Sequence, residues 1–257
     1  MLLNGLLLVL TGAGVGVLAS ILGLGGGVFL VPLLLLGNFV PTAQNASGTS
    51  IVAVLGTSVS AVCAYTRLGV AKKGIGLCLM PAAVLFAWLG ARMTRVFSSD
   101  YLSLAFGLFL LYPAFVMLLS KGKRAHCGEH HNQKPTRRRL LLGVAGACFA
   151  GFVSGLLGIG GGALMVPLLM FLFGFPMIES VATTLLIMIP SAAIATLQHA
   201  LLHNTVWQMA IPVAVGTTIG SQIGARIAKK IPNHLVRKVF AVCLLFVAGQ
   251  MVVRAMG

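Results

Sequence analysis

The chain has 257 residues, of which 58% are hydrophobic and 8% are charged, and its mean hydropathy is +1.03. This composition excludes a soluble globular domain and indicates a polytopic membrane protein whose helices pack against lipid and against one another. The net charge of +15 would suggest nucleic acid as the partner of a soluble protein. Here the basic residues fall in short loops and at the ends of apolar segments, where they act as topology signals and as anchors to membrane lipid. We therefore expect no nucleic-acid partner.

The first expected element is an apolar segment over residues 2–36 that a cluster of glycines interrupts. The cluster opens the sequence Gly-Leu-Gly-Gly-Gly-Val-Phe-Leu-Val-Pro-Leu-Leu, which begins at Gly23. Each glycine in a helix interior costs about 1 kcal/mol relative to alanine, so the cluster predicts a break in the helix. At membrane depth, non-helical backbone is tolerated only where protein or a water-filled cavity satisfies its polar groups.

Three more apolar elements complete the first half. A polar stretch after residue 37 passes into a span that ends near Tyr65, and spans over residues 74–91 and 101–119 follow. The second half repeats this plan after a basic linker. It has a broken segment over residues 140–173 and then spans that end near Leu201, Ala225 and Val253. We assign an N-terminal transmembrane repeat (1–120), a basic linker (121–139) and a C-terminal transmembrane repeat (140–257).

The glycine cluster itself occurs twice. Its second copy begins at Gly158, 135 residues after the first, and eight of the twelve positions are identical. The Gly-Ala-Arg sequence that ends at Arg92 is likewise echoed by the one that ends at Arg226. These matches indicate an internal duplication. Interrupted apolar segments at corresponding positions of two halves are the sequence signal for a transporter binding site.

The distribution of lysine and arginine predicts the topology of the two repeats. If each broken segment crossed the membrane once, the two sides would hold eleven and seven basic residues. If each broken segment went in and came back, one side would hold fifteen and the other three. The positive-inside rule favours the second arrangement, with the linker in the cytoplasm and both termini outside. The expected fold is an all-α polytopic membrane protein with two inverted-topology repeats, each opening with a Gly-broken helix or re-entrant segment.

The two breaks predict one central site for a small anion. A helix that restarts after a break presents N–H groups without an intrahelical partner and a partial positive charge, which together bind oxyanions without a lysine. Neutral hydroxyl and amide groups that follow each break would add further donors. The candidate binding residues are Gly25, Gly26, Gly27, Asn45, Ser47, Thr49 and Ser50 in the first half, and Gly160, Gly161, Gly162, Ser180, Thr183 and Thr184 in the second. The alternative is that the glycines only permit close helix packing.

The paired Gly-x-Gly-Gly-Gly-x-x-x-x-Pro-x-Leu motif, which opens each half of a protein of this length, resembles the sulfite exporter TauE/SafE family of membrane permeases. The Gly-Ala-Arg helix ends fit the same family, and the resemblance covers essentially the whole chain. It implies a secondary transporter, and specifically an exporter, that moves small anions across the bacterial inner membrane. These anions are often sulfur-containing, such as sulfite or sulfonates.

Three charged residues near the apolar segments have alternative roles. Glu179 aligns with Gln44 at the start of a span. It is a candidate for proton coupling, although acids also favour helix N-termini for electrostatic reasons. Arg92 and Arg226 occupy equivalent helix ends, where they either extend to the lipid headgroups or line a vestibule for the anion.

Several histidines leave a second class of function open, a metal-dependent membrane enzyme or sensor. His126 to His131 hold metal-binding residue types without a standard ligand spacing, and His199 and His203 would share a helix face. A third alternative is a passive anion channel. With only three acidic residues in the chain, acid–base catalysis is poorly supported, and we expect no catalytic residue, no metal site and no cofactor. The sequence leaves homo-oligomer formation open.

Overall fold

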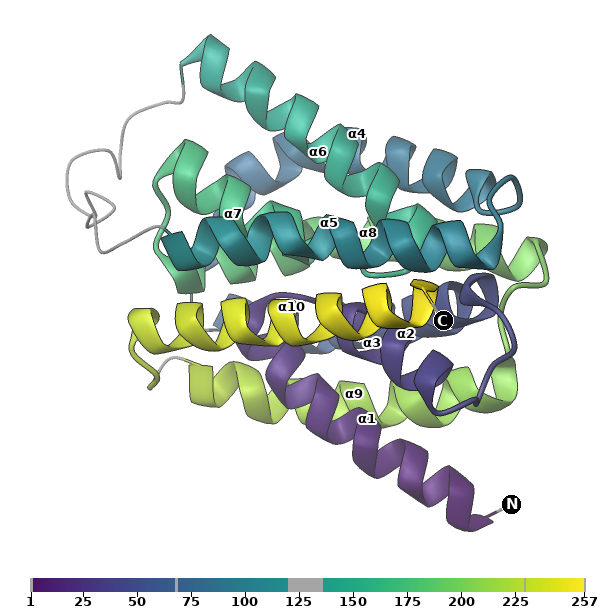
Figure 1. The fold of residues 1–257 in the computed structure, drawn as a ribbon. Coiled ribbons are helices and arrows are strands. Elements are labelled where there is room, and N and C mark those ends of the chain that lie inside the picture. Colours follow the sequence, from purple (N-terminus) through teal and green to yellow (C-terminus); the bar gives the residue numbers. More distant parts are fainter. Residues whose placement is uncertain (1, 68, 120–135, 229, 257) are drawn as a thin grey trace.

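The computed structural model describes residues 2–67, 69–119, 136–228 and 230–256, which form ten α-helices and no strand (Figure 1). Most of the predicted linker lies outside these residues. The helices of the first half are α1 (Leu2–Leu22), α2 (Gly27–Leu36), α3 (Ala43–Arg67), α4 (Lys73–Met93) and α5 (Ser99–Leu119). Those of the second half are α6 (Arg137–Leu157), α7 (Gly162–Phe173), α8 (Met177–Leu201), α9 (Trp207–Ala228) and α10 (Asn233–Met256).

The two halves match helix by helix. Helices α3 and α8 both have 25 residues and start at Ala43 and Met177, so equivalent positions in them differ by 134. The contacts between helices follow the same correspondence. Helix α1 packs on α9 as α6 packs on α4, α3 packs on α9 as α8 packs on α4, and α5 packs on its own counterpart α10. This exchange of partners is what a two-fold relation between the halves produces.

Equivalent helices run in opposite directions. Helix α3 lies parallel to α9, because Thr49 contacts Val206 early in the pair and Ser60 contacts Thr218 later. Helix α8 lies parallel to α4 in the same way. Since short connections make α3 antiparallel to α4, helices α3 and α8 must be antiparallel to each other, as Figure 1 shows. The orientation of the halves relative to a membrane stays a prediction.

Each broken segment is a hairpin in which the second helix turns back. The end of α1 lies beside the end of α3, where the Tyr65 hydroxyl donates a 2.9 Å hydrogen bond to the Ser20 carbonyl. Helix α2 must therefore run back toward Ala43, at the start of α3. In the second half His199 replaces Tyr65, and its Nε2 lies 2.8 Å from the Gly155 carbonyl oxygen near the end of α6. Helices α1/α2 and α6/α7 thus form two hairpins.

Glycines bring α1 close to α9, and α6 close to α4. A Cβ added at Gly220 would overlap the Ala13 carbonyl on α1, and one added at Gly155 would overlap the Ala87 carbonyl on α4. Without a hydrophobic driving force between helices in lipid, such close backbone contact is a main source of association. The glycines therefore fix the spacing on which the rest of each half is built.

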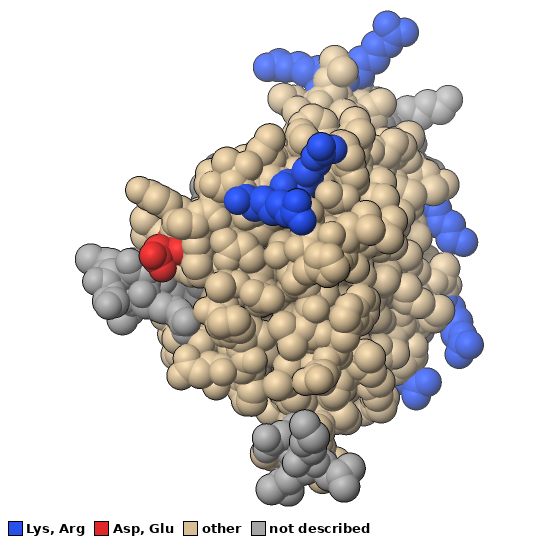
Figure 2. Space-filling model, turned by 90° about the vertical axis from the view of Figure 1, so that its right-hand side faces the viewer, with Lys and Arg blue, Asp and Glu red and all other residues tan. Residues whose placement is uncertain are grey.

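The outer surface matches a lipid environment. Within the described residues, five helices are long and apolar enough to cross a membrane: α1, α3, α4, α6 and α8. Large apolar side chains are exposed along the outer helices, among them Leu85, Leu141 and Phe149. Figure 2 looks along the helices from the right-hand side of Figure 1 and shows a mostly uncharged end face, with several lysine and arginine side chains and one small acidic patch. The chain is a multi-pass membrane protein.

We predict that Gly220→Ala and Gly155→Ala each destabilise the protein, because the added methyl group must push two helix backbones apart. Overpacking of this kind costs roughly 1–3 kcal/mol. Thermal unfolding of the purified protein in detergent would measure the loss as a lower Tm. Gly14→Ala on α1 is the matched control, since nothing lies within 4 Å of its Cβ position. Equal Tm values for all three variants would contradict the prediction.

Candidate functional site

The first break ends in an uncapped helix N-terminus. Gly26 is the N-cap of α2 and has a left-handed backbone with φ of 94°, and no side chain caps the helix. The first intrahelical hydrogen bond of full length runs from the Leu30 N–H to the Gly26 carbonyl, at 3.0 Å. The N–H groups of Gly27 and Val28 precede this bond and donate to no other group in the described part of the chain. Residues 26–30 are buried, except for Phe29, which is half-buried.

The second break repeats this geometry at α7. Gly161 is its N-cap, with φ of 73° and again no side-chain cap. The Met165 N–H donates to the Gly161 carbonyl at 3.0 Å, and the N–H groups of Gly162 and Ala163 have no partner among the described residues. A left-handed N-cap is strained for any residue with a side chain, so both positions require glycine.

The two breaks lie against each other. A Cβ added at Gly27 would overlap the Gly158 carbonyl oxygen, and one added at Gly162 would overlap the Gly23 carbonyl oxygen. The N-terminus of α2 therefore meets the turn after α6, and the N-terminus of α7 meets the turn after α1, backbone to backbone at the interface between the halves. Close packing therefore accounts for glycine at positions 27 and 162, and the left-handed N-caps account for glycine at positions 26 and 161.

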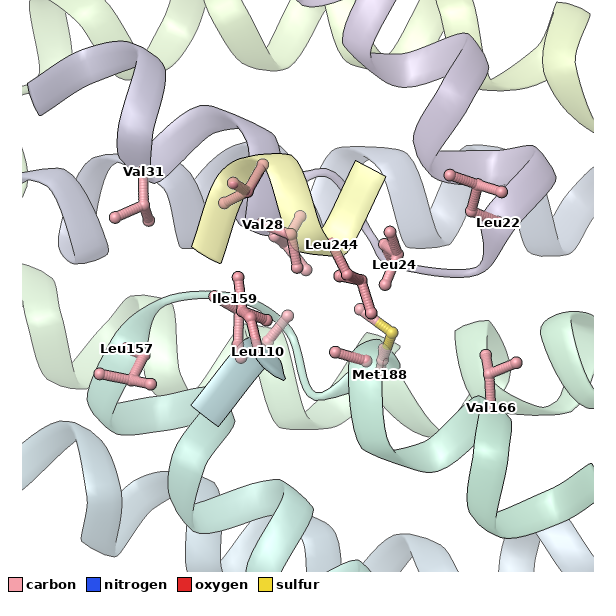
Figure 3. Packing of buried hydrophobic residues seen from close by; sticks show 14 of the residues in the cluster. Leu22, Leu24, Val28, Val31, Leu110, Leu157, Ile159, Val166, Met188 and Leu244 are labelled. Carbon is pink, nitrogen blue, oxygen red and sulfur yellow. The ribbon is translucent and has the colours of Figure 1, made fainter. Parts of the chain in front are cut away.

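Apolar side chains fill the space between the breaks, and they do so in equivalent pairs. Each pair supplies one residue from each half, and all of them are fully or almost fully buried. Figure 3 shows how several of these side chains converge on the turn between α6 and α7. The pairs are Leu24 with Ile159, Leu110 with Leu244, and Val54 with Met188. The sequence analysis identified none of these residues.

Two of the predicted hydroxyl groups hold the halves together. Thr49 Oγ1 accepts a 3.1 Å hydrogen bond from the Val206 N–H, just before α9 begins. At the equivalent position Thr183 Oγ1 accepts a 3.0 Å hydrogen bond from the Lys72 N–H, just before α4 begins. Each of these threonines therefore satisfies a backbone N–H at a helix start in the other half.

A third predicted residue reaches the break directly. Ser50 Oγ lies 2.9 Å from the Gly158 carbonyl and 3.0 Å from the Ser47 carbonyl, so Ser50 ties α3 to the second break. Its equivalent on α8 is Thr184, whose buried Oγ1 has no hydrogen-bond partner in the described structure. Ser154 Oγ is also buried without such a partner, and the Ser154 Cβ is 3.3 Å from the Cβ position of Gly161. Sequence reasoning missed Ser154, because the matching residue in the first half is Ala19.

The other predicted polar residues lie at the helix starts. The Ser180 hydroxyl donates to the Phe175 carbonyl at 3.4 Å, and Asn45 Oδ1 accepts a hydrogen bond from the Thr42 hydroxyl. Both side chains thus bond to neighbouring residues in sequence rather than to the breaks. The predicted set therefore divides into residues at the interface and residues that fix the start of a helix.

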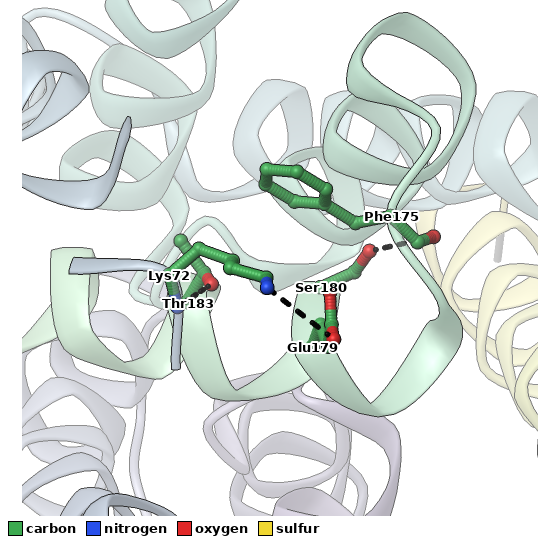
Figure 4. A network of polar contacts seen from close by, with 5 residues as sticks. All are labelled: Lys72, Phe175, Glu179, Ser180 and Thr183. Carbon is green, nitrogen blue, oxygen red and sulfur yellow. Dashed lines mark hydrogen bonds and ion pairs between the residues drawn. The ribbon is translucent and has the colours of Figure 1, made fainter. Parts of the chain in front are cut away.

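Glu179 pairs with a lysine of the other half. The Lys72 ammonium is 3.6 Å from Glu179 Oε1, and the Glu179 side chain is 17% exposed (Figure 4). Thr183 lies one turn further along α8 and accepts the Lys72 N–H, so the loop before α4 is held at two points. The structural equivalent of Glu179 is Asn45, not Gln44 as the sequence alignment gave, because the chain between the break and α8 is one residue shorter than in the first half.

Arg92 and Arg226 lie in the last turns of α4 and α9, which run in opposite directions, so the two side chains are at opposite ends of the molecule. Both are exposed. The Arg92 guanidinium lies 5.5 Å from the ring centroid of Trp88. A cation over a tryptophan near a helix end is typical of an anchor at the membrane interface.

The histidine predictions have different outcomes. Residues 126–131 lie outside the described part of the chain. His199 and His203 do not share a helix face: His199 is buried against Gly155, whereas His203 follows the end of α8 and is exposed. Among the described residues, no three His, Cys, Asp or Glu side chains come together.

Comparison with known proteins gives a consistent match. The family model described as Sulfite exporter TauE/SafE matches residues 8–251. The chain is 29% identical to the "Probable membrane transporter protein YunE" of Bacillus subtilis (strain 168), over 96% of each chain. It is 30% identical to a "Probable membrane transporter protein" of Xylella fastidiosa (strain 9a5c), over 97% of this chain and 96% of that one. With its apolar helices and paired breaks, this membrane transporter belongs to the sulfite exporter TauE/SafE family.

Proposed function

We propose that the protein is a secondary transporter that exports small anions, specifically sulfur-containing ones such as sulfite or sulfonates. The anion binds near the membrane midplane, between the N-termini of α2 and α7. The observation that carries this proposal is that two uncapped, buried helix N-termini lie at the interface between the halves, each packed on the turn that opens the other break. The family description supports the substrate class.

The electrostatics of the breaks favour an anion over a cation or a neutral solute. Each helix N-terminus carries about half a positive charge on its unpaired N–H groups. The glycines allow a ligand to approach those groups closely. No lysine or arginine is buried in the described part of the chain, so the anion would be held by dipoles alone. A site without a full opposite charge suits transport, because the anion must also leave.

The membrane and its sidedness follow from the same proposal. We place the protein in the bacterial inner membrane with the basic linker in the cytoplasm, since fifteen of the eighteen basic residues gather on that side. The opposite directions of α3 and α8 agree with repeats that are inverted across the membrane. Such inversion would bring the two breaks to the same depth, as transporters with inverted repeats commonly do.

The pair of Glu179 and Lys72 supports coupling of transport to protons. A carboxylate at the start of a membrane helix, held by a lysine from the other half, links the protonation of one side chain to the contact between the repeats. We propose Glu179 as the coupling residue. A passive channel would have no such dependence, so the response to a proton gradient separates the two functions.

We predict that Gly26→Ala and Gly161→Ala each lower anion flux roughly tenfold, because a side chain at a left-handed N-cap costs about 1–2 kcal/mol and turns the N–H groups away. Efflux from proteoliposomes loaded with sulfite, thiosulfate, sulfate or a sulfonate would measure this. Gly14→Ala is the control. Undiminished flux in both N-cap variants would rule out the site, and wild-type protein that moves none of these anions would rule out the function.

We predict that Glu179→Gln abolishes the acceleration of flux by a proton gradient while it leaves anion exchange at equal pH intact. The amide keeps the size of the side chain but cannot exchange a proton. Lys72→Gln should retain the acceleration, because the acid remains, and Asp100→Asn on α5 controls for the loss of an acid elsewhere. A Glu179→Gln variant that still responds fully to the gradient would exclude Glu179 as the coupling residue.

A further inference from the structure

The end of one flexible side chain lies where the two glycine breaks come closest. A Cβ added at Gly25 would overlap the terminal methyl group of Met188, and so would a Cβ added at Gly160. The same two Cβ positions also reach the Val54 side chain. The methyl group of Met188 therefore touches both breaks at once and separates them from each other.

Met188 breaks the chemical symmetry between the halves at this point. The neighbouring pairs Leu24 with Ile159 and Leu110 with Leu244 keep a leucine or isoleucine in both halves. At the remaining pair the first half has Val54, which is β-branched and stiff, and the second half has methionine. Methionine has three rotatable side-chain bonds and adapts to irregular space. Figure 3 shows its sulfur among the surrounding leucine side chains.

No open path leads to the N–H groups of the breaks in this conformation, and Met188 fills the point where Gly25 and Gly160 come closest. The break residues are buried, and Met188 itself is 2% exposed. Withdrawal of Leu24 or Ile159 would require the breaks themselves to move, because both residues belong to the turns. Rotation of the Met188 side chain requires no backbone change. The described conformation is thus a closed one, in which an apolar group takes the place of the ligand.

We propose that the thioether end of Met188 occupies the anion position in this closed conformation and withdraws when the anion binds, so that the residue at position 188 sets the size of the anion accepted. This inference rests on the proposed site between the breaks. A single methyl group at that position excludes water from the unpaired N–H groups when no anion is bound. When the methyl group withdraws, it leaves room for an anion head group of limited size.

The test compares anions of increasing size. Efflux of sulfite, methanesulfonate and butanesulfonate is measured in proteoliposomes for the wild-type protein, Met188→Ala and Met188→Val, the last of which copies the residue at position 54. Met165→Ala is the matched control, because Met165 on α7 is equally buried, packs in another cluster and does not contact Gly25 or Gly160. Size-exclusion chromatography and Tm in detergent establish that each variant is folded.

We expect the ratio of butanesulfonate flux to sulfite flux to rise on the order of tenfold in Met188→Ala, less in Met188→Val, and not in Met165→Ala. If Met188→Ala does not fold, the flux ratio of Met188→Val decides the test. An unchanged ratio in variants that still move sulfite overturns the role of Met188 and leaves the transport site intact. An equal rise in Met165→Ala shows a general loosening of the core and overturns it as well. Undiminished flux in Gly26→Ala and Gly161→Ala would instead overturn the site itself.

Discussion

The structure depends on how it satisfies backbone polar groups that are buried in an apolar interior. A helix that stops inside such an interior leaves carbonyl groups without partners, a helix that restarts there leaves N–H groups, and each costs free energy if it stays unpaired. The chain answers most of this demand across the interface between its halves: Ser50 bonds to the Gly158 carbonyl, and Thr49 and Thr183 bond to N–H groups at helix starts. The first turns of α2 and α7 keep buried N–H groups that have no partner in the described structure, so two positive helix ends lie at this interface.

Duplication provides the means to build such an interface. Because the halves run in opposite directions, the main helix contacts of one half return at equivalent places in the other. Tyr65 and His199 illustrate this: they are chemically different, yet both bond to a carbonyl near the end of the helix that precedes a break. The feature that both halves share is therefore the hydrogen bond that holds α1 against α3, or α6 against α8. Either side chain can make it.

The repeated glycine motif allowed the helical class, the two halves and the breaks to be predicted from sequence, since four glycines in five positions have few uses inside an apolar segment. The arrangement of the halves did not follow as fully. One residue fewer before α8 shifts the alignment, so Glu179 corresponds to Asn45 and His199 to Tyr65, and neither pairing could be read from an offset taken at the motif. Met188 and Val54 lie in ordinary apolar spans, and only tertiary packing brings them to Gly25 and Gly160.

The differences between the halves bear directly on the direction of transport. If two inverted halves were identical, the states open to either side of the membrane would have equal free energy, and a bound anion could not favour one of them. Any preference must come from residues whose equivalents differ. The ion pair of Lys72 and Glu179 closes one end of the molecule, whereas Val206 and Asn45 stand at the other. That end of the protein is therefore held by a charged contact, whereas the equivalent residues at the opposite end, Asn45 and Val206, carry no charge.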